Sequence, residues 1–76
     1  MTIKALTKEN FESIITNNEL TLVDFWADWC GPCRIFDEIY RKVHEKFPHV
    51  IFGQVDIQKE KELADVFQVQ SIPMLM

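Results

Sequence analysis

Trp29-Cys30-Gly31-Pro32-Cys33 is the stretch around which the rest of this sequence is organised. Its two cysteines are the only ones in 76 residues, and just two residues separate them. A strand-like apolar run precedes the stretch and a helical pattern follows it, which is the setting in which a C-x-x-C pair serves as a redox dithiol. At the start of a helix, free backbone N–H groups and the helix dipole stabilise a thiolate. The sequence therefore predicts a reactive dithiol at Cys30 and Cys33.

The composition is that of one small folded domain, residues 1–76, with 47% apolar and 12% aromatic residues. The net charge is −4, and the 8 basic residues are scattered among 12 acidic ones, so neither a nucleic-acid nor a membrane partner is indicated. No apolar run approaches the roughly 20 residues that span a bilayer, and the first twenty residues lack the apolar centre of a signal peptide. We therefore expect a soluble, cytoplasmic protein.

Strand and helix patterns alternate along the chain. Apolar, β-branched runs at 3–6, 20–27 and 50–57 predict strands, and helical spacing follows each of them, at 8–16, 33–47 and 58–67. The order β-α-β-α-β-α is typical of an α/β fold with a central parallel sheet and right-handed crossovers. Residues 74–76 have the pattern of a further strand that has just begun.

Apolar side chains at helical spacing predict which helix faces are buried. Thr7 is the expected N-cap of the first helix. The residues expected to face the core are Phe11, Ile14 and Ile15 in the first helix, Phe36, Ile39, Tyr40, Val43 and Phe47 in the second, and Leu63, Val66 and Phe67 in the third.

Asp24 is the one acidic residue within the apolar run at 20–27. Neither a turn nor a sheet edge accounts for it, because Val23 and Phe25 flank it. Burial raises the pKa of a carboxyl group, which suits it to act as a general base or acid. Asp24 is therefore a candidate for proton transfer, and a structural acid with satisfied hydrogen bonds is the alternative.

The run from Val23 to Cys33, with the Val-Asp-Ile strand at 55–57 and Ile72-Pro73 downstream, closely resembles the thioredoxin family. The resemblance covers Thr7 to Met76. Gly-Pro between the cysteines is similar to thioredoxin proper, whereas oxidising and isomerising relatives usually carry a histidine there. The resemblance implies a thioredoxin-like fold, with Cys30 at the C-terminal end of a strand and a cis Pro73 facing the dithiol.

The resemblance also implies a protein-disulfide reductase that takes part in electron transport and cell redox homeostasis and needs no metal or organic cofactor. Cys30, the more exposed thiol, would attack a protein disulfide, and Cys33 would resolve the mixed disulfide. Asp24 would move the proton to or from Cys33. A reductase of the thioredoxin reductase type would restore the dithiol. The residues expected to bind the substrate chain are Trp29, Gly31, Pro32, Ile72 and Pro73.

Three departures from the family pattern bear on this interpretation. Glu38 stands where thioredoxins usually have a proline, so a kinked helix is not implied. Gln54 stands where many bacterial members have a lysine, so Asp24 is expected to lack a nearby cation. The last two antiparallel strands and the final helix of the family are missing from this sequence. We therefore expect a fragment, or a fold that a partner chain completes, and the uncovered edge beside 20–27 favours a swapped or edge-paired dimer.

The two cysteines admit three other interpretations. A purely structural disulfide would close only a tiny loop. A zinc module built from Cys30, Cys33, His44 and His49 fails because the gap before His44 is too short and Pro48 ends the helix between the histidines. A non-catalytic thioredoxin-like fragment that acts as a protein-binding module is the alternative to the enzyme, and a disulfide-reduction assay separates the two.

Overall fold

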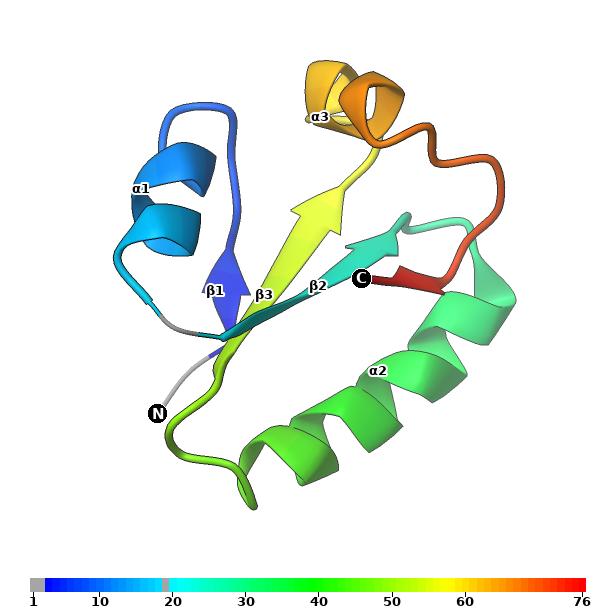
Figure 1. Ribbon diagram of the computed structural model, residues 1–76. Coiled ribbons are helices and arrows are strands. Elements are labelled where there is room, and N and C mark those ends of the chain that lie inside the picture. Colours follow the sequence, from blue (N-terminus) through cyan, green and yellow to red (C-terminus); the bar gives the residue numbers. More distant parts are fainter. Residues whose placement is uncertain (1–2, 19) are drawn as a thin grey trace.

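A computed structural model describes residues 3–18 and 20–76 of the chain (Figure 1). Within these residues, strands and helices alternate as the sequence predicts. The elements are β1 (Lys4–Ala5), α1 (Phe11–Thr16), β2 (Thr21–Trp26), α2 (Gly31–His44), β3 (Ile51–Asp56), α3 (Lys61–Val66) and β4 (Met74–Leu75). The expected β-α-β-α-β-α order and its central parallel sheet are confirmed.

The sheet has the strand order β1-β3-β2-β4. Strands β1, β3 and β2 are parallel, and the β2–β3 register places Asp24 opposite Gln54. Strand β4 pairs with β2 in the antiparallel direction, with Leu75 opposite Asp24. Backbone hydrogen bonds of 2.9 Å in both directions between Val23 and Met76 extend this pairing.

The β2–β4 pairing corrects the expectation that this chain holds no antiparallel strand. After the segment 71–73 the chain turns back, and the apolar residues Met74 and Leu75 use their backbone groups to cover the edge of β2 beside Asp24 and Phe25. The edge strand at this end of the described sheet is therefore β4, not β2.

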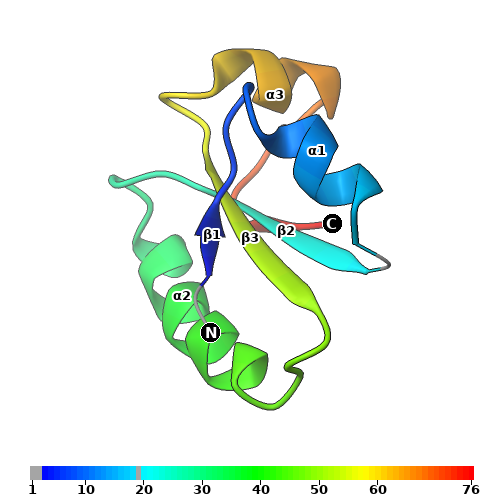
Figure 2. The same cartoon turned by 90° about the vertical axis from the view of Figure 1, so that its left-hand side faces the viewer.

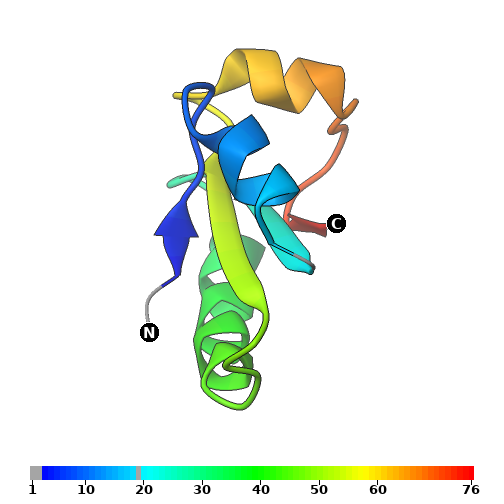
Figure 3. The same ribbon diagram turned by 60° about the vertical axis from the view of Figure 1, so that its left-hand side comes forward.

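Helices cover both faces of the sheet. Helices α1 and α3 lie on one face and α2 lies alone on the other (Figures 1 and 2). The α1/α3 face holds the main apolar core, in which Val23, Phe25 and Val55 are at most 1% exposed. Alternation along β2 directs Val23 and Phe25 to this face and Asp24, between them, to the α2 face. The same layering is visible in a third orientation (Figure 3).

Tyr40 anchors α2 to the sheet. It is 3% exposed and packs edge-on against the ring of Phe52, with ring centroids 5.2 Å apart. Its hydroxyl lies 2.8 Å from the carbonyl oxygen of Gly53 and 3.1 Å from that of Leu22. A buried hydroxyl that reaches two strands fixes the position of α2 relative to β2 and β3.

Four residues expected to face the core are exposed instead: Ile15 (36%), Ile39 (54%), Phe47 (52%) and Val66 (71%). The described part of α2 meets the sheet along a narrow seam whose buried members are Cys33 and Tyr40, so Ile39 lies outside it. Helix α3 is six residues long and buries only Leu63. Periodicity identified these helices but overestimated the width of their buried faces.

The first helix also begins later than expected. Its N-cap is Asn10, not Thr7. The two residues form two hydrogen bonds with each other. The Thr7 N–H donates to Asn10 Oδ1 at 2.8 Å, and the Asn10 N–H donates to Thr7 Oγ1 at 3.3 Å. This reciprocal pair closes a turn, and the α-helix starts only after it, at Phe11.

Candidate functional site

The dithiol lies where β2 gives way to α2. Cys30 is the N-cap of α2 and Pro32 lies in the first turn, where a proline loses no helical hydrogen bond. Cys30 and Cys33 form a disulfide, with their Cα atoms 5.2 Å apart. The backbone N–H of Cys33 donates to Sγ of Cys30 at 3.1 Å. The sulfur of Cys30 thus occupies the position of a capping side-chain oxygen.

The two cysteines are nearly equally buried, Cys30 at 5% exposed and Cys33 at 4%. The sequence interpretation expected Cys30 to be clearly more exposed than Cys33, and in this disulfide form it is not. The two cysteines differ instead in their positions in the helix, because Cys30 is the N-cap and Cys33 lies in the first turn. The surface around them is open: Trp29 is 66% exposed, and Gly31 and Pro32 are exposed as well. The exposed neighbours of the two buried cysteines are therefore a surface on which a polypeptide could bind beside the disulfide.

Ile72 belongs to the same region although it lies 39 positions after Cys33 in the sequence. It packs, partly buried, against the cluster formed by Ala27, Cys30 and Cys33. The Ile72–Pro73 peptide bond is cis, as the resemblance implied. The structure therefore brings the segment before β4 to the dithiol.

Asp24 is 1% exposed, and its two carboxyl oxygens differ in their surroundings. Oδ2 lies 3.4 Å from the amide nitrogen of Gln54, whereas Oδ1 is buried without a hydrogen-bond partner. Burial raises the pKa of Asp24 to about 6; the Gln54 amide lowers it and the charge of Asp37 raises it further. A carboxyl group that exchanges its proton near neutral pH is suited to proton transfer.

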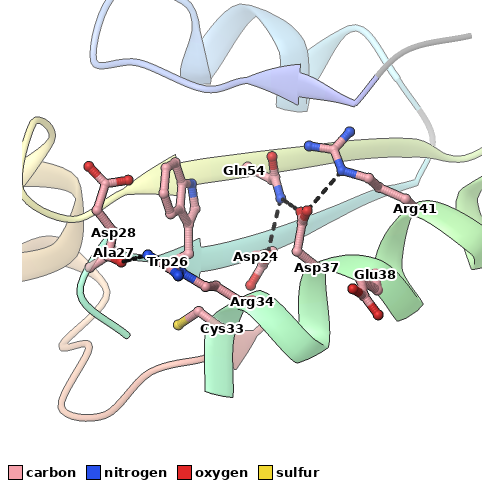
Figure 4. Close-up of a pocket in the computed structure, with 10 residues that line it drawn as sticks. All are labelled: Asp24, Trp26, Ala27, Asp28, Cys33, Arg34, Asp37, Glu38, Arg41 and Gln54. Atoms are coloured by element: carbon pink, nitrogen blue, oxygen red, sulfur yellow. Dashed lines mark hydrogen bonds and ion pairs between the residues drawn. The ribbon is translucent and has the colours of Figure 1, made fainter. Parts of the chain in front are cut away.

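A pocket of about 320 Å³ connects Asp24 with Cys33 (Figure 4). Its walls come from β2, β3, α2 and the loop after β2. The lining residues are Asp24, Trp26, Ala27, Asp28, Cys33, Arg34, Asp37, Glu38, Arg41 and Gln54. Polar walls and this volume leave room for water, so a proton could pass between the carboxyl group and the thiol of Cys33.

Asp37 is a member of the site that the sequence interpretation missed. The Gln54 amide nitrogen donates to Asp37 Oδ1 at 2.7 Å, and Arg41 Nε pairs with Asp37 Oδ2 at 2.8 Å. One signal was present in the sequence: Cys33, Asp37 and Arg41 are spaced four apart, which places them along one face of a helix. Their spacing alone does not reveal Gln54, which comes from β3.

The residues of the zinc alternative are not gathered. His44 is the last residue of α2 and stacks edge-on with Phe52, whereas Cys30 caps the other end. At 1.5 Å per residue, the length of α2 separates them by about 20 Å. Within the described residues, no group of three or more His, Cys, Asp and Glu side chains has the arrangement of a metal site. None of the helices described there is long and apolar enough to cross a membrane.

Comparison with known proteins identifies the family. The sequence model of the Thioredoxin family matches residues 2–76, almost the whole chain, and includes the dithiol, Asp24 and Ile72-Pro73. This chain belongs to the thioredoxin family. A thioredoxin of Chlamydia pneumoniae is 40% identical over 74 residues, which are 97% of this chain and 72% of that protein. A thioredoxin-family protein of Streptomyces coelicolor is 52% identical over 71 residues, 93% of this chain and 53% of that protein.

Solved thioredoxin structures share the fold. Thioredoxin of Plasmodium falciparum superposes with a TM-score of 0.91 at 34% identity, covering 96% of this chain and 72% of that one. Oxidised mitochondrial thioredoxin 3 of Saccharomyces cerevisiae superposes with a TM-score of 0.91 at 30% identity, covering 96% of this chain and 70% of that one. The chain thus spans about half to three quarters of the length of these relatives. In this thioredoxin-family chain α2 runs without interruption through Glu38, the position at which a proline is usual.

Proposed function

We propose that this chain is the dithiol-bearing part of a thiol-disulfide oxidoreductase that reduces protein disulfides. The observation that carries the proposal is the Cys30–Cys33 disulfide at the N-terminus of α2, with Cys33 and Asp24 lining one pocket. Family membership supports it, because thioredoxin relatives match across both cysteines.

The reduction proceeds in two exchanges. In the reduced protein, the Cys30 thiolate attacks one sulfur of the substrate disulfide, which forms a mixed disulfide and releases the first substrate thiol after protonation. Cys33 then gives its proton to Asp24 and attacks Cys30, which releases the second substrate thiol. Two electrons pass to the substrate and the Cys30–Cys33 disulfide remains. The helix N-terminus favours the thiolate of Cys30 because the Cys33 N–H already points at that sulfur.

Substrate binding is assigned to the exposed residues around the sulfur atoms. The indole of Trp29 offers a large apolar surface at 66% exposure, and Gly31 and Pro32, which follow Cys30, are exposed beside it. Ile72, which precedes the cis Pro73, packs against the cluster formed by Ala27, Cys30 and Cys33. An extended substrate segment would lie along the Ile72-Pro73 backbone, as peptides do beside an exposed strand.

The partners proposed are disulfide-bearing proteins and an electron donor of the thioredoxin reductase type, which returns the dithiol to its reduced form. The proposed setting is the cytoplasm, where the reaction serves electron transport and redox homeostasis. A second copy paired along the outer edge of β4 is the proposed form of any dimer, because β4 is the edge strand of the described sheet.

The test is catalysis of insulin reduction by dithiothreitol, followed as precipitation of the released B chain. We expect the wild-type protein at micromolar concentration to accelerate the reaction, and Cys30→Ser and Cys33→Ser each to abolish the acceleration. A folded wild-type protein that binds insulin but reduces it no faster than dithiothreitol alone would be the non-catalytic binding module, and the proposal would be wrong.

A further inference from the structure

The side chain of Gln54 bridges two carboxyl groups that lie on different elements. Its amide nitrogen donates to Asp37 Oδ1 on α2 at 2.7 Å and lies 3.4 Å from Asp24 Oδ2 on β2 (Figure 4). A primary amide has two N–H donors, so both contacts form at once. The difference in length means that Asp37, not Asp24, sets the position of the amide.

Asp37 is itself held in place. Arg41, one turn further along α2, pairs with Asp37 Oδ2 at 2.8 Å, while Oδ1 accepts from Gln54. Both oxygens of Asp37 are therefore engaged, and its side chain is only 33% exposed. A carboxylate fixed on both oxygens and carried by a 14-residue helix is a rigid support for the Gln54 amide.

Asp24 depends on this support. Its Oδ1 is buried with no hydrogen-bond partner, so its hydrogen bond from Gln54, through Oδ2, is the polar contact that orients the carboxyl group. Where a lysine would place a positive charge beside this acid, the structure has a neutral amide held by a second carboxylate. The positive charge of a lysine is thus absent here, and the amide that replaces it contacts a carboxylate that is paired with Arg41.

We propose that Asp37 is a positioning residue of the dithiol site: it holds the Gln54 amide against Asp24, and its negative charge tunes the proton exchange between Asp24 and Cys33. The inference rests on the proposed function, since it concerns the proton step of that reaction. The two actions of Asp37 have opposite signs. The amide it positions favours the carboxylate form of Asp24, and its charge favours the protonated form.

Other groups around Asp24 determine the electrostatic surroundings of its carboxyl group. Strand β3 places the uncharged Gln54 opposite Asp24, and β4 places the uncharged Leu75 opposite it on the other side. Burial raises the pKa of Tyr40 well above its usual range, so this hydroxyl stays neutral. The titratable and charged groups that line the pocket with Asp24, from α2 and from the loop after β2, are Asp28, Cys33, Arg34, Asp37, Glu38 and Arg41. Tyr40 also interacts electrostatically with Asp24.

Asp37→Asn is the decisive variant, because asparagine retains an oxygen that accepts from Gln54 but removes the charge. We expect the titration midpoint of the Asp24 carboxyl carbon, followed by NMR in the oxidised protein, to move to lower pH by about half a unit. The acid limb of the pH profile for insulin reduction should move with it, so that the variant is about twofold faster than wild type at pH 5.5. Asp37→Ala removes the support of the Gln54 amide as well as the charge, so both midpoints should lie at higher pH than in Asp37→Asn.

Glu38→Gln is the matched control, since it removes one negative charge from the same pocket without a contact to Gln54. We expect a smaller shift than in Asp37→Asn. In an Asp24→Asn background, Asp37→Asn should leave the remaining pH profile unchanged, because the group on which it acts is gone. A purely structural role of Asp37 would lower stability in both backgrounds without moving the acid limb.

The outcomes separate the two proposals. A folded wild-type protein without reductase activity defeats the proposed function and, with it, this inference. An active wild type whose Asp24 midpoint and acid limb are the same in Asp37→Asn defeats the inference alone. Equal shifts in Asp37→Asn and Glu38→Gln also defeat it, because any negative charge in the pocket would then act as Asp37 does. Equal midpoints in Asp37→Asn and Asp37→Ala defeat the positioning role, because loss of the contact with the Gln54 amide would then have no effect. If Asp37→Ala does not fold, Asp37→Asn alone decides.

Discussion

The backbone N–H of Cys33 lies 3.1 Å from Sγ of Cys30 and donates a hydrogen bond to it. This contact makes the sulfur of Cys30 the cap of α2. Cys33, one turn inside the helix, has no comparable donor directed at its own sulfur among the described hydrogen bonds. The two cysteines are therefore different chemically although they are almost equally buried.

The first prediction concerns the reactivity of Cys30 in the reduced protein. In Cys33→Ser, the alkylation rate of Cys30 by iodoacetamide should rise with a midpoint near pH 7, below the value of about 8.5 for a free thiol. The reason is that the N–H bond and the helix dipole stabilise the thiolate. The companion Cys30→Ser variant reports Cys33, whose midpoint should be higher. Equal midpoints in the two variants would contradict the capping argument.

The second prediction is that Asp24→Asn stabilises the oxidised protein at neutral pH. The pKa of Asp24 is raised to about 6 in the folded state, above its value of 3.8 in an unfolded chain. Between these values the folded state binds more protons than the unfolded state, so the contribution of Asp24 to stability declines as the pH rises from about 4 to about 6. At pH 7 the raised pKa of Asp24 lowers the free energy of unfolding by its full amount. This amount is about 3 kcal/mol, because each pKa unit corresponds to about 1.36 kcal/mol.

Urea denaturation at two pH values tests this. At pH 7, Asp24→Asn should raise the free energy of unfolding by about 2–3 kcal/mol, and at pH 3.5 the gain should nearly vanish because aspartate is then protonated in both states. The same variant should reduce insulin more slowly, since the proton acceptor for Cys33 is gone. A variant equally stabilised at both pH values would show that the effect does not arise from titration of Asp24.

The third prediction compares the two glycines. A Cβ on Gly53 would lie 2.5 Å from Cδ1 of Leu6, a core side chain that is 2% exposed. Gly53→Ala should therefore destabilise the protein by about 1–3 kcal/mol through overpacking. A Cβ on Gly31 meets nothing within 4 Å, so Gly31→Ala serves as the control and should change the unfolding free energy by less than about 1 kcal/mol. Thermal denaturation of both variants measures the difference, and similar losses in the two would contradict it.

The fourth prediction is a separation of substrate binding from chemistry at Trp29. Because the indole is 66% exposed, Trp29→Ala should leave the unfolding free energy within about 0.5 kcal/mol of wild type. Loss of an apolar contact surface should raise KM for insulin several-fold, while reduction of a small disulfide, which has no polypeptide segment to bind, stays close to the wild-type rate. Equal losses with both substrates would instead place Trp29 in the folding of the dithiol loop.

Local sequence was sufficient where the deciding interactions are local. Trp29-Cys30-Gly31-Pro32-Cys33 indicated the dithiol, the helix that follows it and the family, because a proline in the first turn and a cysteine at the cap act within a few residues. Asp24 could be recognised because a strand covered on both faces leaves no solvent for a carboxylate. The parallel sheet could also be predicted from local sequence. Strands and helices have different periods of apolar residues, and their alternation along the chain is typical of a parallel sheet.

Tertiary structure decided what depends on contacts between distant segments. The bridge from Asp24 through Gln54 to Asp37 joins residues 30 and 17 positions apart, and it exists only because α2 crosses the face of the sheet at which Gln54 points. The burial of α2 and the exposure of Ile39 and Val66 likewise depend on where each helix meets the sheet, which periodicity does not specify. The antiparallel pairing of β4 depends on backbone groups that any sequence possesses, so side chains alone do not reveal it.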